Sequence, residues 1–123
     1  MLDKLDYHAT IPAMDIERAK NFYSEKLGLK PEQEMPYGLV YRCTNGWFLL
    51  YPTPYAGTAQ HTLMGWQTNE IEKEVAGLRA RGVVFEEYDY PNLKTVNGIA
   101  TTGPGKAAWF KDSEGNILGI VQM

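Results

Sequence analysis

The sequence is poor in cysteine, in excess charge of one sign and in long apolar runs, and each shortage narrows what the protein can be. Among its 123 residues Cys43 is the single cysteine, so no internal disulfide can form. With 12 basic and 15 acidic residues the net charge is −3, so no basic patch is expected for nucleic acid or an anionic membrane. No run approaches the roughly eighteen apolar residues of a membrane span, and the N-terminus lacks a secretion-signal pattern. We therefore expect a soluble, cytoplasmic protein.

Familiar catalytic motifs are also missing. No GxSxG, CxxC or HExxH occurs, and Gly103-Pro-Gly-Lys106 lacks the order of a phosphate-binding loop. Cys43 lies in a strand-like run, which favours a packed, reduced thiol over a nucleophile. The acidic run Glu86, Glu87 and Asp89 is typical of a solvated strand edge, with an acid–base pair or a cation-binding patch as the alternative. The sequence thus offers no nucleophile with its base.

What the sequence does contain is a repeated order of elements, which begins with a strand, a helix and a hairpin. Pro12 is expected to end the first strand, Asp15 to cap the helix that follows, and Gly28 to stop it. Asn45-Gly46 is a strong hairpin signal. The strands of this half are expected at residues 5–11, 32–35 (weakly), 39–43 and 47–51. The first half therefore predicts the order βαβββ.

The second half repeats this order after a turn-rich linker at about residues 53–60. Its helix is expected to begin with a capping box between Asn69 and Glu72 and to stop at Gly82. A closing hairpin turns at Gly115, where glycine can adopt a positive φ. The strands of this half are expected at residues 61–68, 83–88, 107–110 and 117–121.

The two halves differ in one long insertion. The hairpin glycine follows the helix stop by 18 residues in the first half and by 33 in the second. The extra residues fall in 89–106, which shows no periodicity. A loop of this length in a small domain is typical of a lid over a site, or else of a mobile connector.

These elements predict one α+β domain over residues 1–123. Repeat one spans about 4–52, the linker about 53–60, and repeat two about 61–123, with the long loop at 89–106. A single βαβββ module cannot bury its sheet alone, so we expect the two to pair. The expected architecture is a curved mixed-sheet cup with the helices on its outer face.

Four segments together resemble one known family, the vicinal-oxygen-chelate superfamily, which includes glyoxalase I, bleomycin-resistance proteins and extradiol dioxygenases. They are His8–Asp15, Ile16–Gly28, Leu78–Val83 and Trp109–Asn116, and in this order they span nearly the whole chain. The resemblance implies paired βαβββ modules and commonly a homodimer.

The resemblance also implies where a metal would bind, on the first and last strand of each module. The corresponding residues here are His8, Leu50, Leu63 and Gly119, of which only His8 can bind a metal. A catalytic divalent ion needs about three protein ligands, so we expect neither metal nor cofactor. His61 is the other histidine, and for both histidines we expect a hydrogen-bonded wall position, with a general base or direct ligand contact as the alternative.

The feature of the sequence that favours ligand binding is its aromatic residues. Several tyrosines, tryptophans and phenylalanines are spread over both halves, and those outside the core could line the cup. Glycine in an apolar strand costs stability. At Gly119 we therefore expect another group to occupy the space of the missing side chain or to approach the backbone closely. The expected ligand-binding residues are His8, Thr10, Phe48, Leu50, His61, Leu63, Gly65, Gln67, Tyr88, Tyr90, Ile117 and Gly119.

The hypothesis from these residues is a metal-free protein that encloses an apolar or aromatic small molecule, similar in kind to the bleomycin-resistance branch. One alternative is a lyase, isomerase or dioxygenase of the same superfamily that uses His8 and/or His61, with or without a divalent metal. Another is an interaction module whose cup is filled on dimerisation. A small-molecule ligand and a second copy of the chain are the partners we expect.

Overall fold

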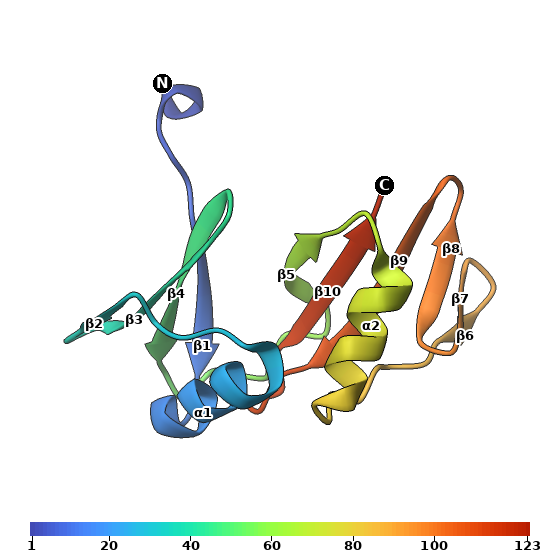
Figure 1. The fold of residues 1–123 in the computed structure, drawn as a ribbon. Helices are drawn as coiled ribbons and strands as arrows, with labels where there is room; N and C mark the ends of the chain where they lie inside the picture. The colour runs from blue at the N-terminus through green and yellow to red at the C-terminus, as the bar shows by residue number, and fades with distance from the viewer.

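The computed structural model describes all 123 residues and shows two modules side by side (Figure 1). After a short 3-10 helix, η1 (Leu2–Lys4), the first module comprises β1 (Ala9–Ala13), α1 (Ile16–Leu27), β2 (Gln33–Met35), β3 (Gly38–Cys43) and β4 (Gly46–Pro52). The second comprises β5 (Thr62–Gln67), α2 (Ile71–Ala80), β6 (Asp89–Tyr90), β7 (Leu93–Val96), β8 (Ile99–Thr102), β9 (Gly105–Lys111) and β10 (Ile117–Gln122). The α+β class expected from the sequence is confirmed.

Each module forms one mixed sheet with the same pairing logic. The first sheet has four strands in the order β1-β4-β3-β2, and the second has six in the order β5-β10-β9-β8-β7-β6. In each, the first strand of the module pairs in parallel with the last, β1 with β4 and β5 with β10. The neighbouring hairpins, β3 with β4 and β9 with β10, are antiparallel. This shared pattern confirms the internal repeat.

The ends of α1 follow the sequence expectation, and the start of α2 does not. The Asp15 side chain accepts a hydrogen bond from the Arg18 backbone N–H, and Gly28 ends α1 at φ 70°. In α2 the N-cap position is Glu70, which makes no side-chain cap. The free N–H groups there are bonded by Thr68 and by the Gln122 side chain of β10. The expected Asn69–Glu72 capping box is therefore wrong, because neighbouring side chains already satisfy the helix start.

The first strand also lies differently from its prediction. It begins at Ala9, not at Leu5, and it continues through Pro12 to Ala13. β1 stands at the end of its sheet, so one side of the strand makes no ladder bonds. A proline without an N–H is tolerated at such an edge.

The insertion at 89–106 is not an irregular loop but contains three short strands. β6, β7 and β8 form a meander that pairs onto β9 and widens the second sheet. Asn97 and Gly98, at φ 53° and 79°, make the tight turn between β7 and β8. The strand expected at 83–88 is reduced to one bridge between Phe85 and Phe110.

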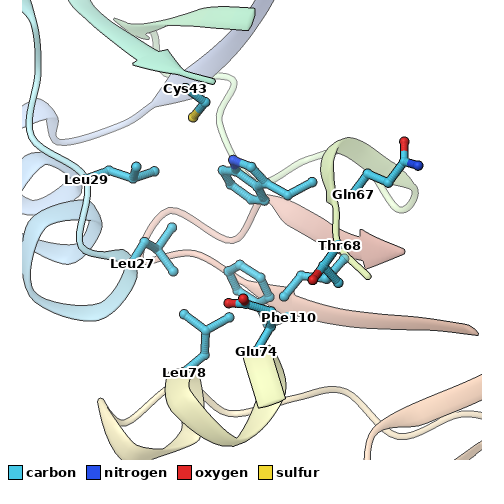
Figure 2. Close-up of a pocket in the computed structure, with 10 residues that line it drawn as sticks. Leu27, Leu29, Cys43, Gln67, Thr68, Glu74, Leu78 and Phe110 are labelled. Carbon is cyan, nitrogen blue, oxygen red and sulfur yellow. The ribbon is translucent and has the colours of Figure 1, made fainter. Parts of the chain in front are cut away.

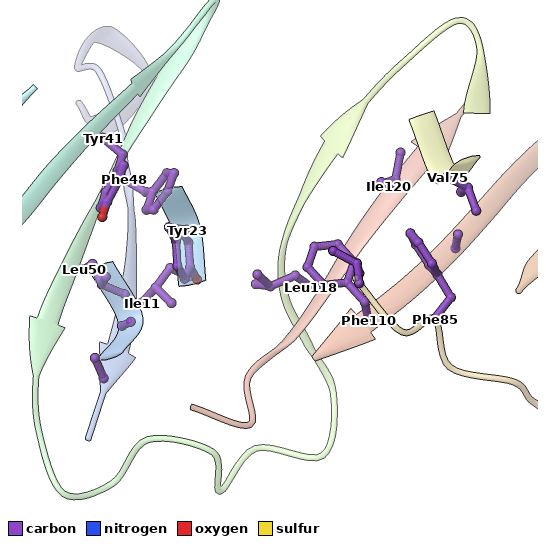
Figure 3. Packing of buried hydrophobic residues seen from close by; sticks show 14 of the residues in the cluster. Ile11, Tyr23, Tyr41, Phe48, Leu50, Val75, Phe85, Phe110, Leu118 and Ile120 are labelled. Carbon is purple, nitrogen blue, oxygen red and sulfur yellow. The ribbon is translucent and has the colours of Figure 1, made fainter. Parts of the chain in front are cut away.

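One hydrophobic core runs through both modules (Figure 3). Tyr23 of α1 packs on Phe48 of β4, and Phe48 meets Trp66 of β5 edge-on at 6.3 Å between ring centroids. Trp66 in turn stacks on Phe110 of β9. We call the sheet face that packs on its module's helix the helix-covered face, and the other the open face. The two helix-covered faces are thus stabilised by one shared core.

A polar turn from the second module ties it to the first. The turn between β9 and β10 buries three polar residues, Asp112, Glu114 and Asn116. Tyr23 of α1 donates to Asp112 at 2.7 Å, and Arg18 donates two hydrogen bonds to Glu114. Asn116 donates its side-chain amide to a backbone carbonyl of β1 at 2.7 Å. No helix of the protein has the length and apolar character needed to cross a membrane.

Candidate functional site

The open face of the first module carries some of the expected ligand-binding residues and lacks others. Along β1 and β4 side chains alternate, so Ile11, Phe48 and Leu50 are buried in the core while Thr10 and Trp47 lie on the open face. Phe48 and Leu50 are therefore corrected from wall residues to core residues. The sequence predicts that side chains alternate along these strands, but it does not show which set faces the core.

An aromatic stack stands on this open face. The His8 ring lies on the Trp47 indole with 3.9 Å between ring centroids and 16° between planes. His8 is exposed and Trp47 is half-buried, so the pair presents a flat surface to solvent. Such a surface can stack on a planar or apolar ligand.

In the second module a β-bulge decides which residues reach the open face. Gly65 and Gln67 of β5 pair with Gly119 and Val121 of β10 and share that face with Ile117. A register shift between Ile117 and Leu118 leaves Leu63 without a partner on β10, and its side chain packs against the core. Leu63 is therefore partly buried against the core.

The room left by the two glycines is taken by the protein itself. A Cβ atom on Gly119 would lie 3.4 Å from the Trp109 indole and 3.5 Å from the Thr62 methyl group. A Cβ atom on Gly65 would lie 3.0 Å from the carbonyl oxygen of Gly119. The Trp109 indole therefore packs against Gly119, and Gly65 allows the backbones of β5 and β10 to approach closely.

Tyr88 and Tyr90 form an aromatic cluster around Trp109, at the base of the meander. Tyr88 meets Trp109 at 5.5 Å in an edge-to-face arrangement and stacks on Tyr90 at 5.9 Å. Burial, with the nearby Glu86 carboxylate second, raises the pKa of Tyr88, so its hydroxyl is neutral at physiological pH. The second open face thus carries its own aromatic surface.

The residues of the chain do not fit a divalent metal. His61 is exposed and its Nδ1 lies 3.2 Å from the neighbouring Thr62 carbonyl, while His8 is stacked on Trp47. No three His, Cys, Asp or Glu side chains gather closely enough to hold an ion. Leucine and glycine at the remaining family positions supply no donor atom.

A cavity with a mostly apolar lining lies elsewhere, at the junction of the two modules (Figure 2). This seam pocket holds about 300 Å³. Its lining residues are Leu27, Leu29, Cys43, Trp66, Gln67, Thr68, Glu74, Leu78, Phe110 and Ile120. Among the residues expected from the sequence it includes only Gln67. Helical and strand periodicity place most of the others in a core, so the sequence carried no signal that a gap remains between them.

A βαβββ module and a second module widened to six strands, each with its first and last strands parallel, make this a paired-module α+β protein. Residues 7–120 match the Glyoxalase/Bleomycin resistance protein/Dioxygenase superfamily, and the chain belongs to this family. The resemblance inferred from sequence is confirmed.

Solved structures share the fold across nearly the whole chain. UcmS2 is 21% identical with a TM-score of 0.73, covering 93% of this chain and 94% of its own. The virulence protein STM3117 from Salmonella typhimurium is 19% identical with a TM-score of 0.70, covering 99% and 98%. Lactoylglutathione lyase from Agrobacterium tumefaciens is 15% identical with a TM-score of 0.69, covering 97% and 93%. No curated protein matches the sequence.

Proposed function

We propose that this protein binds an apolar or aromatic small molecule without a metal, against the aromatic surfaces of its open faces. The observation that carries the proposal is the exposed His8–Trp47 stack, together with the Tyr88–Trp109 cluster of the second module. Aromatic walls with few convergent polar groups suit a ligand that is enclosed rather than transformed. Bleomycin resistance proteins are named in the family's own description, which is compatible with such a role.

We further propose that the cup is completed in a homodimer. No aromatic contact joins the His8–Trp47 stack to the Trp109 cluster within the chain. Each surface lies on one module only, and a second copy can place the open face of one module opposite that of the other. The ligand would then be held between two aromatic walls, one from each chain.

The first test is a non-denaturing mass spectrum of the protein purified without chelator and then offered zinc, nickel, manganese and iron. A metal-free dimer that carries an organic mass is the expected result. One metal per cavity, lost in His8→Ala, would overturn the proposal and favour a lyase, isomerase or dioxygenase activity instead.

Variants then locate the ligand. Binding of the neutral fluorescent probe N-phenyl-1-naphthylamine should weaken about tenfold in Trp47→Ala and in Trp109→Ala, since each loses a stacking surface. Tyr55→Ala, which removes an aromatic ring that is 76% exposed in the linker, is the matched control and should bind normally. Equal binding by all these variants would place the ligand away from the open faces.

A further inference from the structure

A second candidate site exists on the helix-covered side of the sheets, where the two modules meet. The seam pocket of about 300 Å³ is bounded by the end of α1, the end of β5 and one face of α2. Figure 2 shows Leu27 and Leu29 of the first module across from Leu78 and Phe110 of the second. A cavity of this size accommodates one aromatic ring with a short side chain.

The floor of the pocket is aromatic. Trp66 and Phe110 stack with 12° between ring planes and 6.5 Å between centroids, and both line the cavity. Phe110 is fully buried, while Trp66 remains half-buried. An apolar ring placed here would remove the remaining Trp66 surface from water, which favours binding.

The one charged group in the lining is the Glu74 carboxylate. Figure 2 shows it directed from α2 toward the ring of Phe110. The neighbouring carboxylates of α2 are already paired, Glu70 with Lys73 at 3.7 Å and Glu72 with Lys106. Glu74 has no ion pair and its side chain accepts no hydrogen bond from the protein. Glu74 is exposed, so its carboxylate is hydrated in the free protein and open to a cationic ligand.

We propose that the seam pocket binds a small aromatic amine, with the ring on the Trp66–Phe110 floor and the ammonium group against Glu74. No Lys, Arg or His lines the cavity, so an anionic ligand would meet only repulsion. Two cations lie where the helix ends meet: Arg81 donates to the carbonyl of Glu25, and the Lys26 side chain lies against Gly82. Neither lines the pocket. This site is distinct from the open-face surfaces and does not depend on the function proposed for them.

Three matched probes test the charge preference: 2-phenylethylamine, 2-phenylethanol and phenylacetate, each titrated into isotopically labelled protein and followed by NMR. The amine should bind with a Kd on the order of 10⁻⁴ M, about three to five times tighter than the alcohol, because Glu74 is partly solvated. Phenylacetate should bind weakest. Shifts should concentrate at the methyl groups of Leu27, Leu29 and Leu78.

Glu74→Gln should bring the amine to the affinity of the alcohol without changing alcohol binding. Glu72→Gln is the control, because that carboxylate lies on the same helix outside the pocket, and it should leave the amine preference intact. Reaction of Cys43, the only thiol, with a maleimide gives a second readout and should slow as the amine saturates the pocket.

The proposal fails if no probe saturates, if phenylacetate binds as well as the amine, or if the amine preference survives Glu74→Gln. It also fails if the shifts map to Thr10, Trp47 and Trp109, a result that would instead support binding on the open faces. If the amine binds in the seam pocket and no ligand binds on the open faces, this proposal is supported and the proposed function is not.

Discussion

Two tyrosines of the first module, both buried, differ in one hydrogen bond. The hydroxyl of Tyr23 donates to Asp112, whereas the hydroxyl of Tyr41 is buried with no partner. Burial, followed by the Asp112 charge, raises the pKa of Tyr23, and burial raises that of Tyr41 to about 12. Both hydroxyls are thus neutral, and only one of them stabilises the fold through a charged acceptor.

Removing each hydroxyl should therefore have different results. Tyr23→Phe leaves the buried Asp112 carboxylate one donor short and should lower the free energy of unfolding by about 1.5–3 kcal/mol. Tyr41→Phe removes an unsatisfied group and should be neutral or stabilising by up to about 1 kcal/mol. Urea unfolding at pH 7 compares the two, and equal losses would show that the Tyr23–Asp112 bond has no special weight.

Glu114 makes the free energy of unfolding depend on pH in the acid range. Burial alone would raise its pKa, but hydrogen bonds from Arg18, the Asp15 backbone and Ser113 outweigh burial and lower the pKa to about 2. The unfolded value is about 4.3, so this carboxylate stabilises the fold fully above that pH. The contribution is lost as pH falls from about 4.3 through 2.

Glu114→Gln should therefore lower the free energy of unfolding by about 1–2 kcal/mol at pH 6, a figure reduced because the Arg18 partner is solvated. The difference from the native protein should shrink as pH falls toward 2.5. Glu32→Gln, which breaks an ion pair exposed on both sides, should change little at either pH. A Glu114→Gln deficit that stays constant with pH would contradict the assigned pKa.

At the scale of elements, the linker is fixed to the second module by one glycine. Gly57 has φ 75°, and a Cβ atom there would lie 2.4 Å from the Glu114 carbonyl oxygen. The Gly57 N–H also donates to the Asn116 side chain at 3.3 Å. The linker therefore packs directly on the turn between β9 and β10.

Gly57→Ala should destabilise the protein by about 2 kcal/mol or more, since backbone strain and a backbone clash act together. Gly77→Ala is the opposite control, because a Cβ atom on that helical glycine would meet no neighbour within 4 Å. This variant should be more stable by about 0.5–1 kcal/mol. Thermal unfolding followed by circular dichroism compares the two variants, and a tolerated Gly57→Ala would show that the linker can move away.

Elements marked by residues close in sequence were predicted correctly, and elements that depend on distant contacts were not. Asp15, Gly28 and Gly115 act within a few residues, so the ends of α1 and the closing hairpin were predicted correctly. The meander after α2 was missed although Asn97-Gly98, the same dipeptide that marked the first hairpin, stands at its centre. Its strands are short and pair only through the wider sheet, so periodicity did not reveal them.

The site was harder to predict than the fold for a related reason. Alternation along β4 groups Phe48 with Leu50, but the packing of a distant helix decides that this pair faces the core. On β5 one unpaired residue, Leu63, changes which side chains reach the open face. Neither the position of the helix nor the bulge can be predicted from the alternation of residues along one strand.

At the scale of the whole molecule, the shared core makes the two modules one folding unit. Phe48 and Trp66 join the aromatic cores of the modules, and Tyr23 reaches Asp112 across the same boundary. Neither module keeps a complete core without the other. Unfolding should therefore be a single cooperative transition.

Native-state hydrogen exchange measures this cooperativity. The slowest amides of β1 and of β10 should report the same free energy of opening and the same dependence on denaturant. A first module that opens at a clearly lower free energy than the second would show that the core contacts between them are weak. Ile11, on β1, and Ile120, on β10, are suitable reporters because the Ile11 backbone faces β4 and β10 is paired on both sides.

The side chains of the turn between β9 and β10 bond to α1 and β1 of the first module and to the linker. Asp112, Glu114 and Asn116 therefore join the modules alongside the shared core, and neither set of contacts needs an unbroken linker. A chain cut at the exposed Thr58 keeps every one of those bonds. The two halves, encoded as separate polypeptides, should then find each other and reassemble into the same fold.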